Sequence, residues 1–518
     1  MASERKAWLL FILTIFFVYL HAFRPLFTPF FYENDNLIFL SDADRMLQGD
    51  ILYRDFFQFT FPGTQLIYFS LFQIFGREYW ILGVVIIAVA GITFWLSLSI
   101  SKEVIRGPLA YLPPVIFVFF GLRWFGIDGT HRVFAPAFIL AAIVIVLRGA
   151  GLWRMGLAGA MCALASFFSQ PKGLLGLIAI VLFILADAIF ESRGWKQWGL
   201  TCLAAASGFV ISLSLLCTYF IYTAGWDTFV WSTFTYPAEH YGLHPDNTYA
   251  IFFTSLKPFL ESQGPGRVLA GIAALFYSAV LPLTTLVFFV IFWSRRKQQS
   301  WSYWRGPFFV GLVGLIMYAG TTAPMYVRLF SISTPSLVLL VWLLSELEWL
   351  KARSVAIAII ATTFLVATGY FQVLYFQARS DIRYEETRTG TVAIAEPNPA
   401  FQRYVWLRDH AKPGDYVYEV YEPFVYFPFQ LRNPTRIGQV FPNGYTSKEI
   451  IQDVISGLEK RRPRYILWDN SYLVSPGSRN PDDNTGPLAA LIQRDYAPVG
   501  EVFDVGGQPI QIWERRSQ

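Results

Sequence analysis

Residues 79–100 read YWILGVVIIAVAGITFWLSLSI and contain no charged side chain. A helix of roughly 20 mostly apolar residues is long enough to cross the hydrocarbon core of a bilayer. The rest of the chain has the same character, because 54% of its 518 residues are hydrophobic and only 15% are charged. Typical soluble domains carry about 25% charged residues. The composition therefore excludes one large soluble protein and a disordered chain, and indicates a polytopic membrane protein.

Ten further stretches are apolar enough to be spanning helices. The first, residues 7–23, follows Arg5 and Lys6, and no small-x-small cleavage site follows Leu20, so we interpret it as a retained helix and not as a signal peptide. The others are residues 109–125, 133–148, 155–170, 173–190, 197–223, 267–293, 305–321, 328–345 and 354–376. The sequence thus predicts an all-α membrane domain with about eleven transmembrane helices.

Basic residues recur in alternate connections between these stretches. They are Arg5, Lys6, Lys102, Arg106, Arg148, Arg154, Arg193, Lys196, Arg295, Arg296, Lys297, Lys351 and Arg353. Because cytoplasmic loops are enriched in Lys and Arg, we predict a multi-pass protein of the inner (plasma) membrane with a cytoplasmic N-terminus. An odd number of spans then places the tail outside the cytoplasm. These loop cations account for much of the net charge of +5, so no nucleic-acid partner is predicted.

The density of charge rises sharply near residue 380. About a ninth of the earlier residues and about a quarter of the later ones are charged, which are values typical of membrane and soluble domains. We predict a membrane domain over residues 1–380 and an extracytoplasmic, soluble α/β domain over residues 381–518. Predicted helices cover residues 401–411 and a segment that ends at Arg461 after a capping box of Thr446 and Glu449. Predicted strands cover residues 416–421, 464–468 and 509–513.

Known chemical motifs are missing from this tail, which has no Gly-rich phosphate loop, nucleophile elbow or pair of helical metal-ligating histidines. The three cysteines, Cys162, Cys202 and Cys217, all lie in apolar runs, so neither a disulfide framework nor a CxxC metal motif is predicted.

The predicted first outer loop, residues 24–78, is the most informative segment. Residues 37–47 and 65–75 have helical apolar spacing and are expected to lie along the membrane surface. Just before them, residues 32–36 read YENDN. A carboxylate there, such as Asp35, would have a raised proton affinity if aromatic neighbours shielded it, and would suit a general base.

Two other interpretations of Asp35 stay open, since it could be a solvated loop acid or the N-cap of the helix that follows. Asp42 and Asp44, further along that helix, are expected on its solvated face.

The stretch 32–76 resembles the first periplasmic loop of the GT-C glycosyltransferases, in particular the bacterial branch of protein O-mannosyltransferases and aminoarabinose transferases. The pieces that carry the resemblance are Asp35 and residues 43–47, 49–54 and 61–65. The family often has Asp-Glu at the start. Here Asn36 follows Asp35, so the second carboxylate is missing and Glu33 is its substitute.

Residues 321–335, 401–422 and 459–469 resemble other parts of the same family. The resemblance implies a membrane-embedded transferase that takes a sugar from a polyprenyl-phosphate donor and transfers it at the outer face.

A lipid phosphate beside the membrane needs cationic partners. On the predicted topology, Arg132, Lys172 and Arg328 lie at the outer ends of spans, where ionisable residues are candidates for function. The alternative for each is snorkelling to the lipid headgroups. Asp128 and His131 stand next to Arg132 in a polar segment, and the resemblance implies that Asp128 is a second carboxylate of the site.

A metal site is the remaining possibility for the outer loops. Glu239, His240, His244 and Asp246 are residue types that bind Zn or Mn, but their spacing fits no strong zinc motif, so ordinary loop residues and no metal are predicted.

These residues predict an inverting single displacement. Asp35 would accept the proton of the acceptor hydroxyl, while Arg132, Lys172 and Arg328 stabilise the departing phosphate. Asp128 would be the second catalytic acid, and Glu33 and His131 would bind substrate. The donor arrives already activated, so no cofactor is predicted; the acceptor is a protein, a lipid or a polysaccharide. The alternative is a polytopic transporter or lipid flippase of the cell envelope, which inverted repeats would favour.

Overall fold

The computed structural model describes residues 2–122, 128–191, 194–261, 265–346, 366, 368–370, 372–377, 379–396, 398, 401–420, 423–473, 482–505 and 508–516. The chain divides into two compact units, each built from three segments. The first unit comprises Met1–Ala22, Val84–Thr218 and Thr248–Gln377; the second comprises Phe23–Gly83, Tyr219–Asn247 and Ala378–Gln518. The second unit thus joins residues of the predicted first outer loop to the tail, and the domain boundary at residue 380 stays a prediction.

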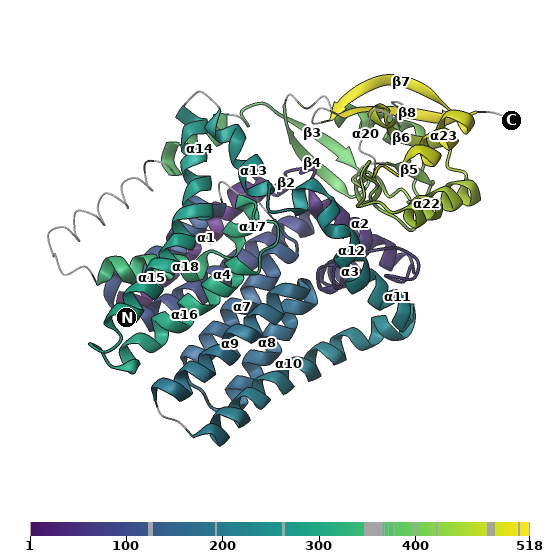
Figure 1. The fold of residues 1–518 in the computed structure, drawn as a ribbon. Coiled ribbons are helices and arrows are strands. Elements are labelled where there is room, and N and C mark those ends of the chain that lie inside the picture. The colour runs from purple at the N-terminus through teal and green to yellow at the C-terminus, as the bar shows by residue number, and fades with distance from the viewer. Residues whose placement is uncertain are drawn as a thin grey trace. The chain divides into compact units, whose positions relative to one another are not determined.

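The first unit is helical (Figure 1). Its α-helices are α1 (Ala2–Ala22), most of α4 (Trp80–Val104), α5 (Leu112–Val115), α7 (His131–Leu147), α8 (Leu152–Phe168), α9 (Gln170–Phe190), most of α10 (Trp195–Ala224), α13 (Ile251–Leu260), α14 (Pro265–Leu275), α15 (Leu281–Arg295), α16 (Trp301–Ala319), α17 (Tyr326–Ser331) and α18 (Thr334–Ser345). A 3₁₀ turn, η1 (Gly107–Tyr111), and two π-helical segments, η2 (Ile116–Leu122) and η6 (Phe276–Val280), continue neighbouring helices. α7, α8 and α9 pack side by side.

Five helices of the described chain are long and apolar enough to cross a membrane: Glu4–Ala22, Trp80–Val104, Gln170–Phe190, Trp195–Ala224 and Val268–Arg295. This makes the protein a multi-pass membrane protein. Four shorter apolar helices, Gly107–Gly121, His131–Leu147, Leu152–Phe168 and Thr334–Ser345, also coincide with predicted spans.

The predicted stretch 328–345 is interrupted between α17 and α18, and 354–376 lies largely outside the described residues. The number eleven and the orientation therefore stay predictions.

The second unit begins with a short hairpin of β1 (Phe23–Arg24) and β2 (Thr28–Pro29), followed by α2 (Asp35–Leu47) and α3 (Gly63–Phe75). Both predicted helices of the first loop are thereby confirmed; their position along a membrane surface stays a prediction. The middle segment contributes α11 (Trp226–Val230), η3 (Trp231–Thr235), α12 (Tyr236–His240), η4 (Tyr241–Leu243) and η5 (Pro245–Asn247).

The tail of this unit is a small α/β fold. It contains the antiparallel hairpin β3 (Ile382–Thr387) and β4 (Gly390–Ala395), and the helices α20 (Gln402–His410), α21 (Tyr426–Phe429), α22 (Lys448–Arg461) and α23 (Gly486–Asp495), with the turn η8 (Asn470–Leu473). A four-stranded sheet has the order β5 (Val417–Glu419), β6 (Tyr465–Asp469), β8 (Gln508–Arg515) and β7 (Tyr496–Val505). β5 is parallel to β6, and the other pairs are antiparallel.

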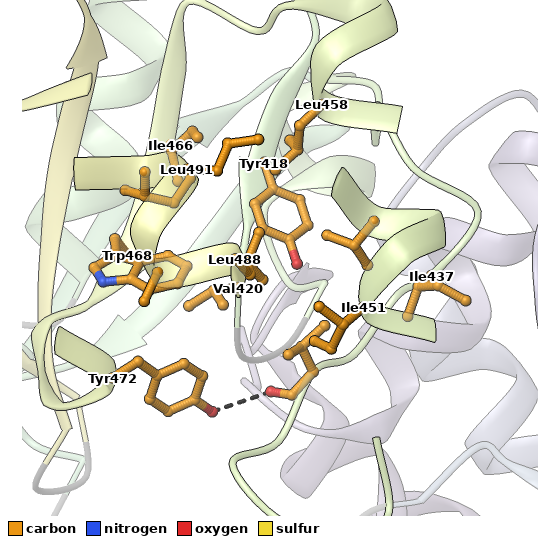
Figure 2. Close-up of a cluster of buried hydrophobic side chains, with 14 of the residues drawn as sticks. Tyr418, Val420, Ile437, Ile451, Leu458, Ile466, Trp468, Tyr472, Leu488 and Leu491 are labelled. Atoms are coloured by element: carbon orange, nitrogen blue, oxygen red, sulfur yellow. Dashed lines mark hydrogen bonds between the residues drawn. The ribbon is translucent and has the colours of Figure 1, made fainter. Parts of the chain in front are cut away.

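The core of the tail packs on the central strand β6, whose five residues are all buried. Figure 2 shows Trp468 of this strand among Tyr418, Leu488 and Ile451, and Tyr472 Oη donating a 3.0 Å hydrogen bond to the Val440 carbonyl. A strand buried on both faces reads as a continuous apolar run, which is why residues 464–468 were recognisable in the sequence.

The predicted α/β tail is confirmed, with one local correction at the start of α22. The N-cap is Ser447, whose Oγ accepts a hydrogen bond from Ile450 N (3.3 Å), and not Thr446. Thr446 Oγ1 instead accepts from the backbone N of Phe441 (2.8 Å). The two hydroxyl residues are adjacent, so spacing alone did not distinguish them.

Backbone hydrogen bonds tie the first loop to the tail within this unit. Phe31 N donates to Ala393 O (3.0 Å), Tyr79 N to Thr389 O (2.9 Å) and Phe57 N to Arg436 O (2.8 Å). The loop is therefore a part of the second unit's fold, held at both of its ends and in its middle.

Candidate functional site

The polar segment that precedes α7 is a compact capping structure. Thr130 is the N-cap, and its Oγ1 accepts from Arg132 N (3.3 Å). Asp128 Oδ1 accepts from Thr130 N (2.7 Å), while Asp128 Oδ2 lies 3.5 Å from Arg132 Nη1. Both side chains are half-buried. The structure thus holds Asp128 and Arg132 together as a pair whose charges face the start of α7.

Lys172 enters the same cluster through the first turn of α9. Glycine at position 173 lets this turn approach α8 closely, since a Cβ there would collide with Cys162 O and with Ser166. Electrostatic interactions link the Lys172 ammonium to Arg132, Asp128 and Arg328.

Arg328 lies on α17, which packs against α7, and its Nη1 donates to Ala323 O (3.5 Å). His131, half-buried at the first position of α7, interacts electrostatically with all three cations. The structure therefore brings together five of the seven predicted site residues: Asp128, His131, Arg132, Lys172 and Arg328. Three basic side chains against one carboxylate give this cluster an excess of positive charge, as an anion site requires.

Two small apolar cavities reach this cluster in the first unit. One, of about 40 Å³, is lined by Asp128 together with Phe17, Ile86, Leu140 and Phe330. The other, of about 20 Å³, is lined by Lys172 together with Ile139, Met317 and Pro335. Both cavities are far smaller than the roughly 300–1,000 Å³ of a small-molecule site, so what they show is apolar surface beside the charged groups and not a preformed ligand pocket.

Asp35 and Glu33 lie in the second unit. Asp35 is the first residue of α2 and is half-buried. The N-cap is Asn34, whose Oδ1 accepts from Asn36 N (3.0 Å), so the interpretation of Asp35 as the N-cap is wrong. The capping requirement of this helix is thus met by Asn34 and not by Asp35.

Glu33 forms an ion pair within the second unit. Its Oε2 accepts a 2.8 Å hydrogen bond from Nη2 of Arg403 on α20, and the Arg403 side chain is only 1% exposed. A buried guanidinium needs such a partner. Glu33 thus anchors the chain that leads into α2.

The expectation that Asp42 and Asp44 lie on a solvated face is wrong, since both are buried. Asp42 Oδ2 accepts from Gln58 Nε2 (3.0 Å) and Gln65 Nε2 (3.2 Å), and burial raises the pKa of this carboxyl to about 6. Asp44 is paired with Arg77 at 2.8 Å, and burial raises its pKa as well.

These two aspartates were missed because the polar face of a helix normally points to water. Here that face packs against residues of the first loop and the tail, as the hydrogen bond from Ser41 Oγ to Pro423 O (3.2 Å) shows. The density of polar residues at positions 41–45 was the available signal.

Comparison with known proteins gives matches in structure only. No family model matches the sequence, and no curated protein matches it. ArnT from Cupriavidus metallidurans in the apo state matches with a TM-score of 0.58 at 12% sequence identity, over 99% of this chain and 98% of that one. The same protein bound to undecaprenyl phosphate gives a TM-score of 0.56 at 12% identity, over 98% and 97% of the two chains.

The archaeal oligosaccharyltransferase AglB from Archaeoglobus fulgidus, in complex with an inhibitory peptide and a dolichol-phosphate, is also similar in fold. Its TM-score is 0.53 at 11% identity, over 96% of this chain and 73% of that one. This chain has an ArnT-like fold along nearly its whole length, which agrees with the resemblance seen in the sequence at the level of the fold.

Proposed function

We propose that this protein is an integral membrane glycosyltransferase that transfers a sugar from a polyprenyl-phosphate donor to an acceptor hydroxyl at the outer face of the membrane. The observation that carries the proposal is the cluster of Arg132, Lys172 and Arg328 beside apolar cavities. Its fold is shared with ArnT, which was solved bound to undecaprenyl phosphate, and with AglB, solved with a dolichol-phosphate. Polyprenyl phosphate has an anionic phosphate, which the three basic side chains would bind, and a long hydrocarbon chain, which the neighbouring apolar surface would contact.

The proposed reaction is a single displacement at the anomeric carbon. The acceptor oxygen forms the new C–O bond while the bond between the anomeric carbon and the phosphate oxygen breaks. Asp35 takes the acceptor proton, and polyprenyl phosphate leaves as an anion that Arg132, Lys172 and Arg328 stabilise. Because one displacement occurs, the anomeric configuration is inverted.

Asp128 and His131 complete the proposed phosphate site. Asp128 orients Arg132 through their ion pair and, by its charge, keeps the cluster from repelling itself. For Glu33, the ion pair with Arg403 supports a role in positioning the segment before Asp35 more than direct contact with substrate.

The proposal is tested by donor binding. Arg132→Ala and Arg328→Ala should each weaken the affinity of the purified protein for undecaprenyl phosphate by roughly 10- to 150-fold, because a charge-assisted contact contributes about 1.5–3 kcal/mol. Arg296→Ala is the matched control, since Arg296 is a half-buried arginine just after α15, with its guanidinium over the Trp293 ring at 3.7 Å. Equal losses in all three variants, or unchanged affinity in the first two, would remove the cluster from this role.

A further inference from the structure

The second unit contains a cavity of about 470 Å³ that the proposed chemistry does not use. Its walls come from α2, from residues of the first loop between positions 50 and 59, and from the tail, including α22. Small-molecule sites typically enclose about 300–1,000 Å³, so this cavity is large enough for a ligand of two or three sugar rings. Ile38, on its wall, lies one helical turn after Asp35, the candidate base.

The charges that line this cavity are nearly balanced, with five aspartates and six basic residues. Several form ion pairs along the wall, such as Arg45 with Asp50 (2.9 Å) and Arg436 with Asp453 (3.1 Å). A ligand with a net charge therefore gains little attraction. Hydroxyl groups, which both donate and accept, match a wall of alternating donors and acceptors.

Two further features suit a saccharide. Asp42 and Gln58 stand together on the wall, joined by a 3.0 Å hydrogen bond. The carboxylate has further lone pairs and the amide a second N–H, so the pair has the capacity to bond neighbouring hydroxyls as well. The half-buried aromatic rings of Phe57 and Phe59 line the cavity and supply apolar surface for the C–H faces of sugar rings.

We propose that this cavity binds a neutral oligosaccharide, so that the acceptor of the proposed transferase is a glycan. The inference rests on the proposed function, and it names the substrate class on the acceptor side. The glycan would lie along α2 with its reactive hydroxyl toward the N-terminal end of that helix, where Asp35 is placed.

The test is a binding experiment that needs no donor. The full chain in detergent is mixed with a pool of neutral oligosaccharides of two to six residues, with a pool of acidic oligosaccharides, or with a pool of short peptides. Saturation-transfer difference NMR then reports which pool receives magnetisation from the protein.

Ser456 offers a way to block the cavity without disturbing the core. It is exposed on α22 and lines the cavity, so Ser456→Trp fills the space from its rim. Gln452→Trp is the matched control, because Gln452 is exposed on the same helix one turn earlier and does not line the cavity.

We expect signals from the neutral pool that fall at least ten-fold in Ser456→Trp and stay unchanged in Gln452→Trp and in Arg132→Ala. No signal from the neutral pool, stronger signals from the acidic pool or the peptides, or equal signals in Ser456→Trp would overturn the proposal. Failure of the proposed function gives a different result. In that case the protein would still bind the glycan, but it would neither bind undecaprenyl phosphate nor consume a lipid-linked sugar.

Discussion

Replacing Asp35 by Asn tests the proposed general base without removing the cap of α2. The substitution changes an oxygen to an amide nitrogen at the first position of α2 and leaves the Asn34 cap, with its 3.0 Å hydrogen bond, in place. The loss of one negative charge in the first helical turn should cost about 0.3–1 kcal/mol of stability. The folded protein should therefore be extracted and should melt almost as the wild type does.

The effect on turnover should be much larger. An amide accepts no proton at neutral pH, and general-base catalysis contributes about 10²–10⁴-fold to the rate. We expect transfer to slow at least a hundred-fold, which is about 2.7 kcal/mol of barrier, while the affinity for undecaprenyl phosphate stays the same. The assay follows the release of polyprenyl phosphate from a lipid-linked sugar under single-turnover conditions.

Asn34→Ala is the reciprocal control. It removes the cap and should destabilise the second unit by about 1 kcal/mol, but it leaves the base and the rate largely intact. Near-normal turnover in Asp35→Asn would refute the assignment of the base. If Asp128→Asn were then the slow variant, the base would lie before α7 instead.

Three further predictions concern the second unit and the topology. A reporter fused after Gln377 should be active only outside the cytoplasm, and cytoplasmic activity would contradict the predicted orientation. The pKa of Asp42 in the folded protein, about 6, lies above its ordinary value of 3.8, so ionisation opposes folding. Thermal melts should show the wild type losing up to roughly 3 kcal/mol of stability as the pH rises from about 4 to above 6, and Asp42→Asn should remove that loss; an unchanged pH profile would argue against it. Glu33→Gln should destabilise the protein by about 3 kcal/mol, because Arg403 loses its charged partner, without changing donor affinity; weaker donor binding in a protein of normal stability would support a substrate contact.

Most of the helices could be predicted from the sequence, because the length and hydropathy of a segment are enough to identify a membrane span. The capping segment around Asp128 and Arg132 was also recognisable, since its residues are neighbours in the chain. Lys172 and Arg328 could each be identified from the sequence as a candidate phosphate-binding residue. Their meeting with Arg132 depends on how α7, α9 and α17 pack, which no local pattern encodes.

The second unit contains several features that could not be predicted from the sequence. The hairpin of β3 and β4 and the long strand β7 were not predicted, because their alternation is weak and their residues are partly exposed. The burial of Asp42 was predicted wrongly because its partners, Gln58 and Gln65, come from a different part of the loop. Polar residues that satisfy one another inside a fold look like solvated residues in the sequence.

The second unit's three-segment construction has a consequence for biogenesis. The first loop emerges early in synthesis, but the strand and helix that hold it, through Ala393 and Arg403, are made only after roughly 300 further residues, which takes about 15–60 s at about 5–20 residues per second. During that interval Glu33 and the polar face of α2 have no tail to pack against. The loop can therefore reach its final fold only after the tail has been synthesised. The rate of translation, and not the folding rate of the loop, then determines when the proposed base reaches its final position.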